Sequence, residues 1–295
     1  MTHRKQIFYP TSRTYYINFV NSISEEFPIE PPNYLLLGFE GFEQPSTDIQ
    51  MSKAPYQDGK TLIDDIFDER LITLTFAIFG DTQQEIFDRR ALVNQKFNSR
   101  LGIGTLIFNQ VNGNTYYLDV ITKSINFTKS IESSYTIAVI QLIAPNPFWY
   151  DPTQIERIMV GFSGGFSFPF SLPVSFGTVG TQLTISNSGN IETPVLIYFY
   201  GEVVNPVIQN LTTEEEISII QTIPDDDILI INTAFGEKSV MILSGGEYIN
   251  AFEYVDPDSV FWKLKPSDNV VRYTVSSEGE NAQCRIYYYN RFSGV

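Results

Sequence analysis

The stretch Ala144-Pro145-Asn146-Pro147-Phe148-Trp149-Tyr150-Asp151-Pro152 decides how the chain is organised. Its three prolines cannot continue a central strand, because proline lacks the N–H that a sheet ladder needs. The interleaved phenylalanine, tryptophan and tyrosine indicate a packed junction and not a loose linker. The chain has 295 residues, which is enough for two domains. We therefore predict one domain over residues 1–147 and a second over residues 148–295.

Upstream of the junction, the sequence is typical of strands. Alternating runs rich in β-formers predict strands at residues 15–20, 70–80 and 135–143. Asn112-Gly113, between two further runs, is a strong signal for a β-hairpin. Residues 40–60 are polar, contain the turn signal Asp58-Gly59, and are predicted as a loop.

One helix interrupts these strands. Thr82 and Glu85 form a T-x-x-E capping box, which marks a helix N-terminus. The helix is expected to end near Asn98, before Gly102. Within the helix, the apolar residues Ile86, Val93 and Phe97 fall on one face at helical spacing.

Downstream of the junction, short strands follow one another with turn residues between them. Many short strands at this spacing favour a β-sandwich. The whole chain is therefore predicted to be mainly β with one α-helix. The candidate strands are residues 182–187, 195–201, 206–211, 217–220, 228–232, 239–243, 247–249, 260–264, 270–275 and 285–289.

The charge of the chain limits its partners. The net charge is −15; residues 1–150 hold 12 basic against 16 acidic residues, and residues 151–295 hold 7 against 18. A surface of this sign repels phosphate backbones, so specific nucleic-acid binding is not expected. The N-terminal residues lead into no long apolar stretch, so neither a signal peptide of the usual form nor membrane insertion is expected.

Histidine and cysteine are too scarce for most catalytic sites. The chain has one of each, His3 and Cys284. One histidine near a terminus argues against a Ser-His-Asp or Cys-His catalyst, and a site with several histidine ligands is excluded. We expect no catalytic residues, metal site or cofactor. Carboxylate-only chemistry, chiefly glycoside hydrolysis, is the remaining enzymatic alternative.

Two runs of carboxylates are the candidates for such chemistry. Asp225-Asp226-Asp227 follows Pro224 and precedes an apolar run, which is where a solvated turn belongs. Calcium binding or half of a glycosidase pair are the alternatives. Glu214-Glu215-Glu216 is most simply an exposed turn between two strands.

Aromatic residues of the second domain suggest contact surfaces. Trp262, Tyr287 and Tyr288 could stack on sugar rings, or pack in the core or against another subunit. On a strand, Tyr287 and Tyr289 share one face and Tyr288 takes the other, so at least one face must be core.

Residues 161–177 are apolar, uncharged and broken by glycine and proline. A solvated linker would be polar. The segment is therefore either an extended arm buried along its own domain or a subunit contact. Its candidate contact residues are Phe166, Phe168 and Phe170.

The order of these features resembles the distal tail proteins of long-tailed, siphovirus-type bacteriophages and prophages, particularly those of Gram-positive hosts. Each motif is weak alone, but together their order and spacing are fairly specific. The motifs are the junction at residues 144–151, the run at residues 165–177, Ile185-Ser186-Asn187-Ser188-Gly189-Asn190 with Pro194, and Gly201 followed by residues 206–213.

The resemblance implies a structural virion protein and not an enzyme. Members form a ring, usually a hexamer, at the distal end of the tail tube. Their N-terminal domain, a tail-tube-like β-sandwich plus helix, builds the ring, and a galectin-like or jelly-roll β-sandwich projects from it. The implied partners are further copies of the chain, the major tail tube protein, the tail-associated fibre or lysin protein, and receptor-binding proteins. The implied place is the baseplate at the virion tail tip, after assembly in the host cytoplasm.

A second hypothesis stands beside this one. The chain could be a carbohydrate-binding adhesion module of the baseplate, using the aromatic surface of its second domain. A carboxylate-only glycosidase is the third.

Overall fold

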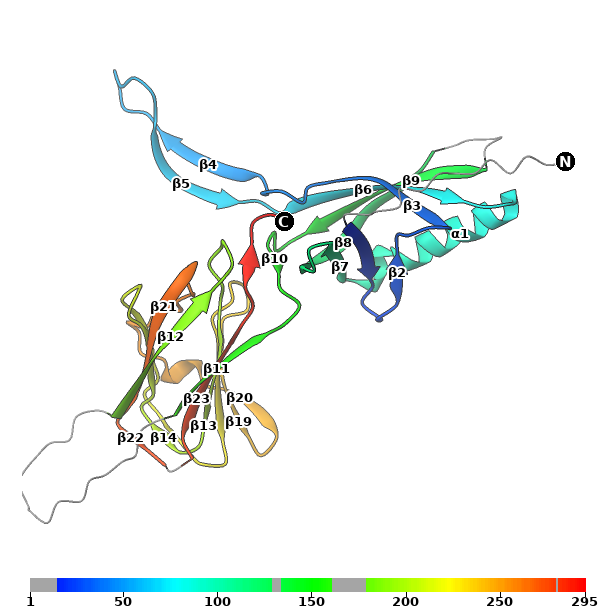
Figure 1. The fold of residues 1–295 in the computed structure, drawn as a ribbon. Coiled ribbons are helices and arrows are strands. Elements are labelled where there is room, and N and C mark those ends of the chain that lie inside the picture. The colour runs from blue at the N-terminus through cyan, green and yellow to red at the C-terminus, as the bar shows by residue number, and fades with distance from the viewer. Residues whose placement is uncertain (1–14, 129–133, 161–178, 280) are drawn as a thin grey trace, which may run out of the picture. The chain divides into compact units, whose positions relative to one another are not determined.

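A computed structural model describes residues 15–128, 134–160, 179–279 and 281–295 (Figure 1). The chain forms two compact units. Unit 1 comprises the chain up to Pro152 together with Phe292–Val295, and unit 2 comprises Thr153–Arg291. Residues 148–152 therefore lie in unit 1, beyond the boundary expected after residue 147. The last four residues also belong to unit 1.

The main sheet of unit 1 has nine strands. Their order is β2-β1-β7-β8-β9-β6-β3, with β10 and β24 paired at the side. The strands are β1 (Tyr15–Val20), β2 (Glu26–Pro28), β3 (Tyr34–Glu40), β6 (Arg70–Phe79), β7 (Gly104–Gln110), β8 (Thr115–Phe127), β9 (Tyr135–Ala144), β10 (Trp149–Tyr150) and β24 (Arg291–Phe292).

Strand β8 closes this sheet into a sandwich. Residues 115–120 pair with β7, and residues 121–127 pair with β9. Because different halves of this one long strand pair with β7 and with β9, the sheet divides into two layers that share β8. Inward side chains of both layers join one buried core, for example Leu106 and Ile140. The fold is mainly β, as the composition predicted.

Helix α1 (Gln83–Lys96) is the only α-helix among the described residues. The Thr82 hydroxyl accepts a hydrogen bond from the Glu85 N–H at 3.2 Å, as the capping box predicted. Ile86 and Val93 are buried, and the ring of Phe97 stacks on Phe19 of β1 at 4.3 Å between centroids. The helix therefore packs on the sheet through the predicted face.

Residues 40–60 are not simply a loop, so that prediction was wrong. Strands β4 (Thr47–Ser52) and β5 (Thr61–Phe67) form an antiparallel hairpin, which is a sheet of its own. The apolar residues of the run are few and separated by polar ones, so its composition resembles that of a loop. Its alternation is nevertheless that of a strand with one polar face.

The described residues of unit 2 form three sheets. The largest runs β11-β23-β13-β18-β19-β20, the second β12-β21-β15-β16 and the smallest β17-β14-β22. Their strands are β11 (Ile155–Val160), β12 (Val179–Asn187), β13 (Leu196–Tyr200), β14 (Val203–Val204), β15 (Val207–Asn210), β16 (Glu215–Ser218), β17 (Thr222–Ile223), β18 (Ile228–Asn232), β19 (Ser239–Ser244), β20 (Glu247–Asn250), β21 (Ser267–Val275), β22 (Ser277–Glu278) and β23 (Gln283–Tyr288).

The two larger sheets of unit 2 share one core. Phe199 of β13 and Tyr273 of β21 meet at 5.5 Å between ring centroids, and both belong to the same buried cluster. This is the predicted β-sandwich. Residues 260–264, however, do not form a strand: only Leu264 makes a bridge, to Thr193. The side chains of Asn210 and Asn187 donate to the carbonyls of Lys263 and Leu264 in this segment, where a strand would use a backbone partner.

Cys284 lies in the core of unit 2 and should be chemically inert. Its side chain is fully buried, and this burial raises the pKa of the thiol. Because the thiolate is the reactive form, we expect no labelling of the native protein by a thiol reagent and full labelling after unfolding in denaturant. Rapid labelling under native conditions would contradict the structure.

Candidate assembly interface

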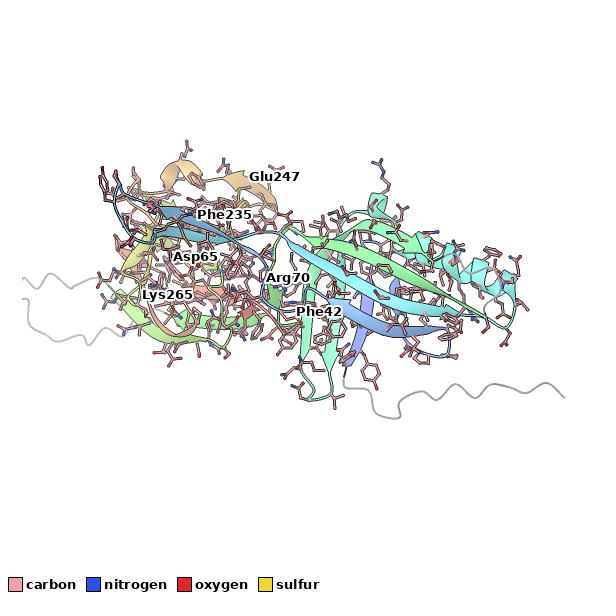
Figure 2. The ribbon with its side chains drawn as sticks, turned by 90° about the horizontal axis from the view of Figure 1, so that it is seen from above. Phe42, Asp65, Arg70, Phe235, Glu247 and Lys265 are labelled. Carbon is pink, nitrogen blue, oxygen red and sulfur yellow. The ribbon has the colours of Figure 1, made fainter. Side chains whose placement is uncertain are left out.

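The β4–β5 hairpin, here called the arm, lacks support from other strands. Among the described residues, β4 and β5 pair only with each other. Figure 1 shows both strands, and Figure 2 labels Asp65 on β5 and Arg70 at the start of β6. An isolated two-stranded hairpin is at best marginally stable in water. The arm therefore has a surface that a partner would stabilise.

The pairing register gives the arm two different faces. Directly opposed residues share a face, and Ile49 lies opposite Asp65 while Met51 lies opposite Leu62. The register shifts between these two pairs, and the exposed Ile63 is left without a paired residue at this bulge. We call this the apolar face of the arm. Ile49 is 52% exposed and Leu62 is 58% exposed. The opposite face carries the pairs Asp48 with Ile66, Gln50 with Asp64, and Ser52 with Thr61.

Aromatic packing holds the base of the arm against the junction. The ring of Phe67, the last residue of β5, meets Phe148 edge-on at 5.7 Å. Trp149 is fully buried and packs on Phe42 at 5.0 Å. The junction is therefore a packed part of unit 1, as its aromatic residues indicated.

Arg70 ties this region together. Its side chain is buried, with the residue 2% exposed. The guanidinium donates to the carbonyl oxygens of Pro147, Gly41 and Ser293, each at 2.7 Å, and also to that of Glu43. Burial lowers the pKa of Arg70 to about 10, which still leaves it charged at neutral pH. One guanidinium group thus joins three segments that are far apart in the sequence by hydrogen bonds to their carbonyl groups.

The loop before the arm tolerates only glycine at position 41. Gly41 has a φ of +86°, and a β-carbon there would lie 2.0 Å from the Leu71 carbonyl oxygen. The C-terminal residues close the same region, since the Val295 N–H donates to the Phe42 carbonyl at 3.1 Å. The segment from which the arm extends is therefore held in place by close backbone packing and by the C-terminal residues.

Two of the aromatic residues proposed as contacts are buried in unit 2. Trp262 is 1% exposed, and its indole N–H donates to the Ile208 carbonyl at 3.2 Å. Tyr288 is also in the core, and its hydroxyl donates to the Ser186 carbonyl at 2.8 Å. Neither ring has a free face for a sugar, so a glycan role for these two is corrected to core packing.

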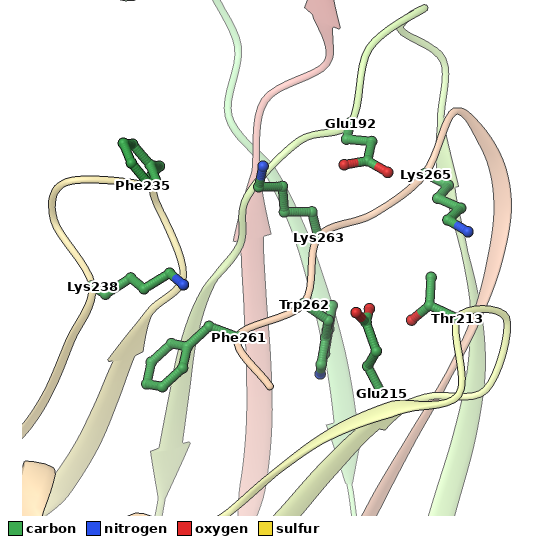
Figure 3. Close-up of a pocket in the computed structure, with 9 residues that line it drawn as sticks. All are labelled: Glu192, Thr213, Glu215, Phe235, Lys238, Phe261, Trp262, Lys263 and Lys265. Atoms are coloured by element: carbon green, nitrogen blue, oxygen red, sulfur yellow. The ribbon is translucent and has the colours of Figure 1, made fainter. Parts of the chain in front are cut away.

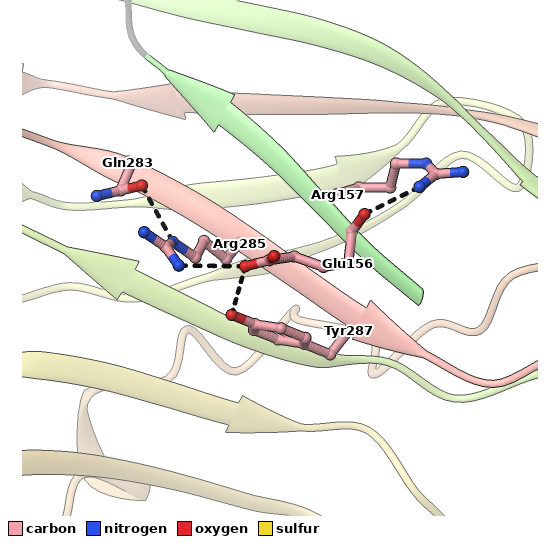
Figure 4. Close-up of polar contacts among 5 residues, drawn as sticks. All are labelled: Glu156, Arg157, Gln283, Arg285 and Tyr287. Atoms are coloured by element: carbon pink, nitrogen blue, oxygen red, sulfur yellow. Dashed lines mark hydrogen bonds and ion pairs between the residues drawn. The ribbon is translucent and has the colours of Figure 1, made fainter. Parts of the chain in front are cut away.

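Tyr287 points to the other side of β23 and belongs to a polar cluster (Figure 4). Its hydroxyl donates to Glu156 at 2.6 Å, and Arg285 contacts the same carboxylate oxygen at 3.2 Å. The hydrogen bond to Glu156 raises the pKa of the Tyr287 hydroxyl. The Arg285 guanidinium also lies over the Tyr200 ring at 4.9 Å. Tyr287 is thus engaged within unit 2.

The other candidates do not form a catalytic site. Asp225-Asp226-Asp227 lies on the turn before β18, as predicted, and the first two residues are exposed. Glu214 lies in a turn, whereas the next two glutamates begin β16. Among the described residues, no cluster of His, Cys, Asp and Glu could hold a metal ion. His3, Phe166, Phe168 and Phe170 lie outside the described residues.

No helix in the described ranges has the length and apolar character needed to cross a membrane.

Two family profiles match separate parts of the chain. The phage tail protein RIFT-related domain matches residues 29–140, and the siphovirus-type tail component, C-terminal domain, matches residues 188–292. The chain belongs to the siphovirus-type distal tail proteins. In this distal tail protein the first match falls in unit 1 and contains the arm. The second covers most of unit 2.

Solved structures have the same fold. The SPP1 Dit protein, described as a paradigm of the hub adsorption apparatus in Gram-positive infecting phages, aligns with a TM-score of 0.67 at 11% identity, over 94% of this chain and 99% of that one. A chain of the phage p2 baseplate in its activated conformation with Ca aligns with a TM-score of 0.53 at 10% identity, over 96% and 100%. The corresponding structure with Sr gives 0.54 at 10%, over 95% and 99%. Identities this low establish the fold alone. A search of curated proteins found no match.

Sequence reasoning missed the arm and Arg70 of this distal tail protein. The Asp58-Gly59 turn, flanked by the spaced apolar residues Ile49, Met51 and Leu62, was the available signal for the arm. Nothing in the sequence singles out Arg70, because its four acceptors come from three distant segments.

Proposed function

We propose that this distal tail protein is a structural hub subunit, and that its copies close into a hexameric ring at the distal end of the tail. Unit 1 builds the ring, and unit 2 projects from it. The ring joins the major tail tube protein to the tail-associated fibre or lysin protein and to receptor-binding proteins. This places the chain in the virion tail tip, after assembly in the host cytoplasm.

The arm is the observation that carries this proposal. Its apolar face exposes Ile49, Met51 and Leu62 on a hairpin that no other described strand supports. Exposed apolar surface of this kind marks an interaction site. A second copy is the partner that fits a subunit of a symmetric assembly, and its arm would be covered in the same way by the next copy.

An arm that packs on a different surface of its neighbour makes a head-to-tail contact. Such contacts produce rings when the rotation between subunits closes. The rest of unit 1 has exposed apolar residues on which a neighbour's arm could pack. They are Leu37 at the bulge of the edge strand β3, and Phe87 and Leu92 on α1. These features support a ring more than an isolated two-unit protein.

A structural role also agrees with where the reactive groups lie. Asp225 and Asp226 are on an exposed turn, and Cys284 is buried in the core. A glycosidase would need two carboxyl groups that face each other across a substrate cleft. We therefore propose that the chain has no catalytic activity.

The oligomeric state tests the ring. We expect a particle six times the mass of the chain in native mass measurement, alone or with the tail tube protein, and rings with a central channel in negative-stain electron microscopy. A protein that stays monomeric both alone and with its tube and fibre partners would contradict the proposal.

A further inference from the structure

Unit 2 has a pocket of about 470 Å³ that is lined by basic, acidic and aromatic side chains (Figure 3). The C-terminal half of the chain is strongly acidic and contains only three lysines: Lys238, Lys263 and Lys265. All three line this pocket. They come from two segments that are separated in the sequence, so the fold brings three of the seven basic residues of this half to one place, while its four arginines lie outside the pocket.

Buried asparagines fix the backbone that carries two of these lysines. Asn210 donates to the Lys263 carbonyl at 3.3 Å, and Asn269 donates to the Lys265 carbonyl at 2.8 Å. Asn187 donates to the carbonyl of the residue between them at 3.1 Å. Each of the three asparagines is at most 1% exposed. The two lysines therefore start from a rigid backbone, which lowers the entropy cost of binding a ligand.

The charged side chains that line the pocket form no ion pairs with one another among the described residues. Among the described residues, no ion pair within 4.0 Å involves any of the three lysines. Glu192 and Glu215 also line the pocket without such a pair. The ammonium groups can therefore bind an anionic group, while the two carboxylates can accept hydrogen bonds from hydroxyl groups.

Two phenylalanines complete the lining. Phe235 is 89% exposed, so its ring is open to a ligand. Phe261 is held from one side by Phe252, whose ring stacks on it at 5.7 Å, and the Lys238 ammonium lies 5.5 Å from its centroid. These rings give flat apolar surfaces beside the charged groups.

We propose that this pocket binds an anionic saccharide, a sugar chain that carries phosphate or carboxylate groups. The lysines bind the anionic groups, the glutamates accept from sugar hydroxyls, and the phenylalanine rings cover sugar faces. An acidic peptide fits less well, because it has few hydroxyls and would bring carboxylates toward Glu192 and Glu215. The inference does not depend on ring formation. Trp262 also lines the pocket but is only 1% exposed, so the rings assigned to the sugar are those of Phe235 and Phe261.

Titration of the full-length protein tests this site. The probes are oligosaccharides of phosphomannan (phosphate groups), hyaluronan (carboxylate groups) and dextran (neutral), together with poly-glutamate. We expect saturable binding of phosphomannan, hyaluronan or both, which weakens as salt is added. Dextran and poly-glutamate should not bind. Comparing the first two probes identifies the anionic group.

Variants then assign the binding to the pocket. Lys263→Gln and Lys265→Gln should each weaken binding by about tenfold, the effect of losing one hydrogen bond from a charged group. Phe235→Ala should also weaken it. Arg272→Gln is the matched control, because it removes the same charge from the exposed face of β21 outside the pocket.

Several results would overturn the proposal. These are equal binding of dextran, lysine-dependent binding of poly-glutamate, no binding of any saccharide, or equal binding by the lysine variants and wild type. Circular dichroism and the urea midpoint show whether each variant keeps its fold, since Trp262 lines the pocket and its fluorescence could respond to the substitutions directly. Since Lys265 is exposed and Lys263 is partly exposed, loss of folding is not expected.

Discussion

Ring assembly is expected to be lost when Met51→Asp and Leu62→Asp are combined. These two residues face each other across the arm on its apolar face. Covering an exposed apolar side chain of this size contributes about 1.5–3 kcal/mol. Two carboxylates in its place would have to be buried without partners, which costs more. We expect association to weaken by about a hundredfold or more.

The opposite face supplies the control for this experiment. Ser52→Asp with Thr61→Asp changes the neighbouring register pair and also places two carboxylates opposite each other. Both double variants therefore carry the same repulsion within the hairpin. Native mass measurement and electron microscopy should show rings for the control and single chains for the apolar-face variant. If both double variants form rings, the apolar face of the arm is not part of the interface. If neither forms rings, the hairpin must be intact for assembly but its apolar face is not singled out.

Unit 1 is expected to lose about 3 kcal/mol or more of its free energy of unfolding when Arg70 is replaced by methionine. The substitution keeps much of the side-chain volume but leaves the carbonyls of Gly41, Glu43, Pro147 and Ser293 without their donor. Leaving a buried polar group unsatisfied costs about 1–3 kcal/mol, and water that enters the site can recover only part of it. Arg70→Lys should be nearly as harmful, because an ammonium cannot reproduce the planar geometry of the guanidinium.

The two tryptophans allow the units to be followed separately. Trp149 lies in unit 1, 5.9 Å from the Arg70 guanidinium, and Trp262 lies in unit 2. In a Trp262→Phe background, fluorescence during urea unfolding reports unit 1 alone. The exposed Arg100 gives the control Arg100→Met, which should change little. An Arg70→Met protein with an unchanged midpoint would contradict the role of Arg70 as the anchor.

Local chemistry explains which parts of the fold could be predicted. The Thr82 cap, the Asn112-Gly113 turn and the alternation of the long strands depend on neighbours within a few residues, and each is in the structure. The candidate contact residues were less well predicted. For Trp262 the sequence left core packing, a subunit contact and sugar stacking open, because residue type alone does not reveal that the ring is buried in the core cluster of unit 2.

The sequence by itself determined the β-rich class, the single described helix, the packed junction near residue 148 and the likeness to distal tail proteins. Those properties follow from short-range rules and from the order of motifs along the chain. Only the tertiary structure decided that a polar run forms an amphipathic arm, that Arg70 joins the arm base, the junction and the C-terminal residues, and that three lysines share one pocket. The arm is local, but its faces depend on the pairing register, which the turn signal alone does not give. The contacts of Arg70 and the lysine pocket join residues that are far apart in the chain, and no local pattern encodes such contacts.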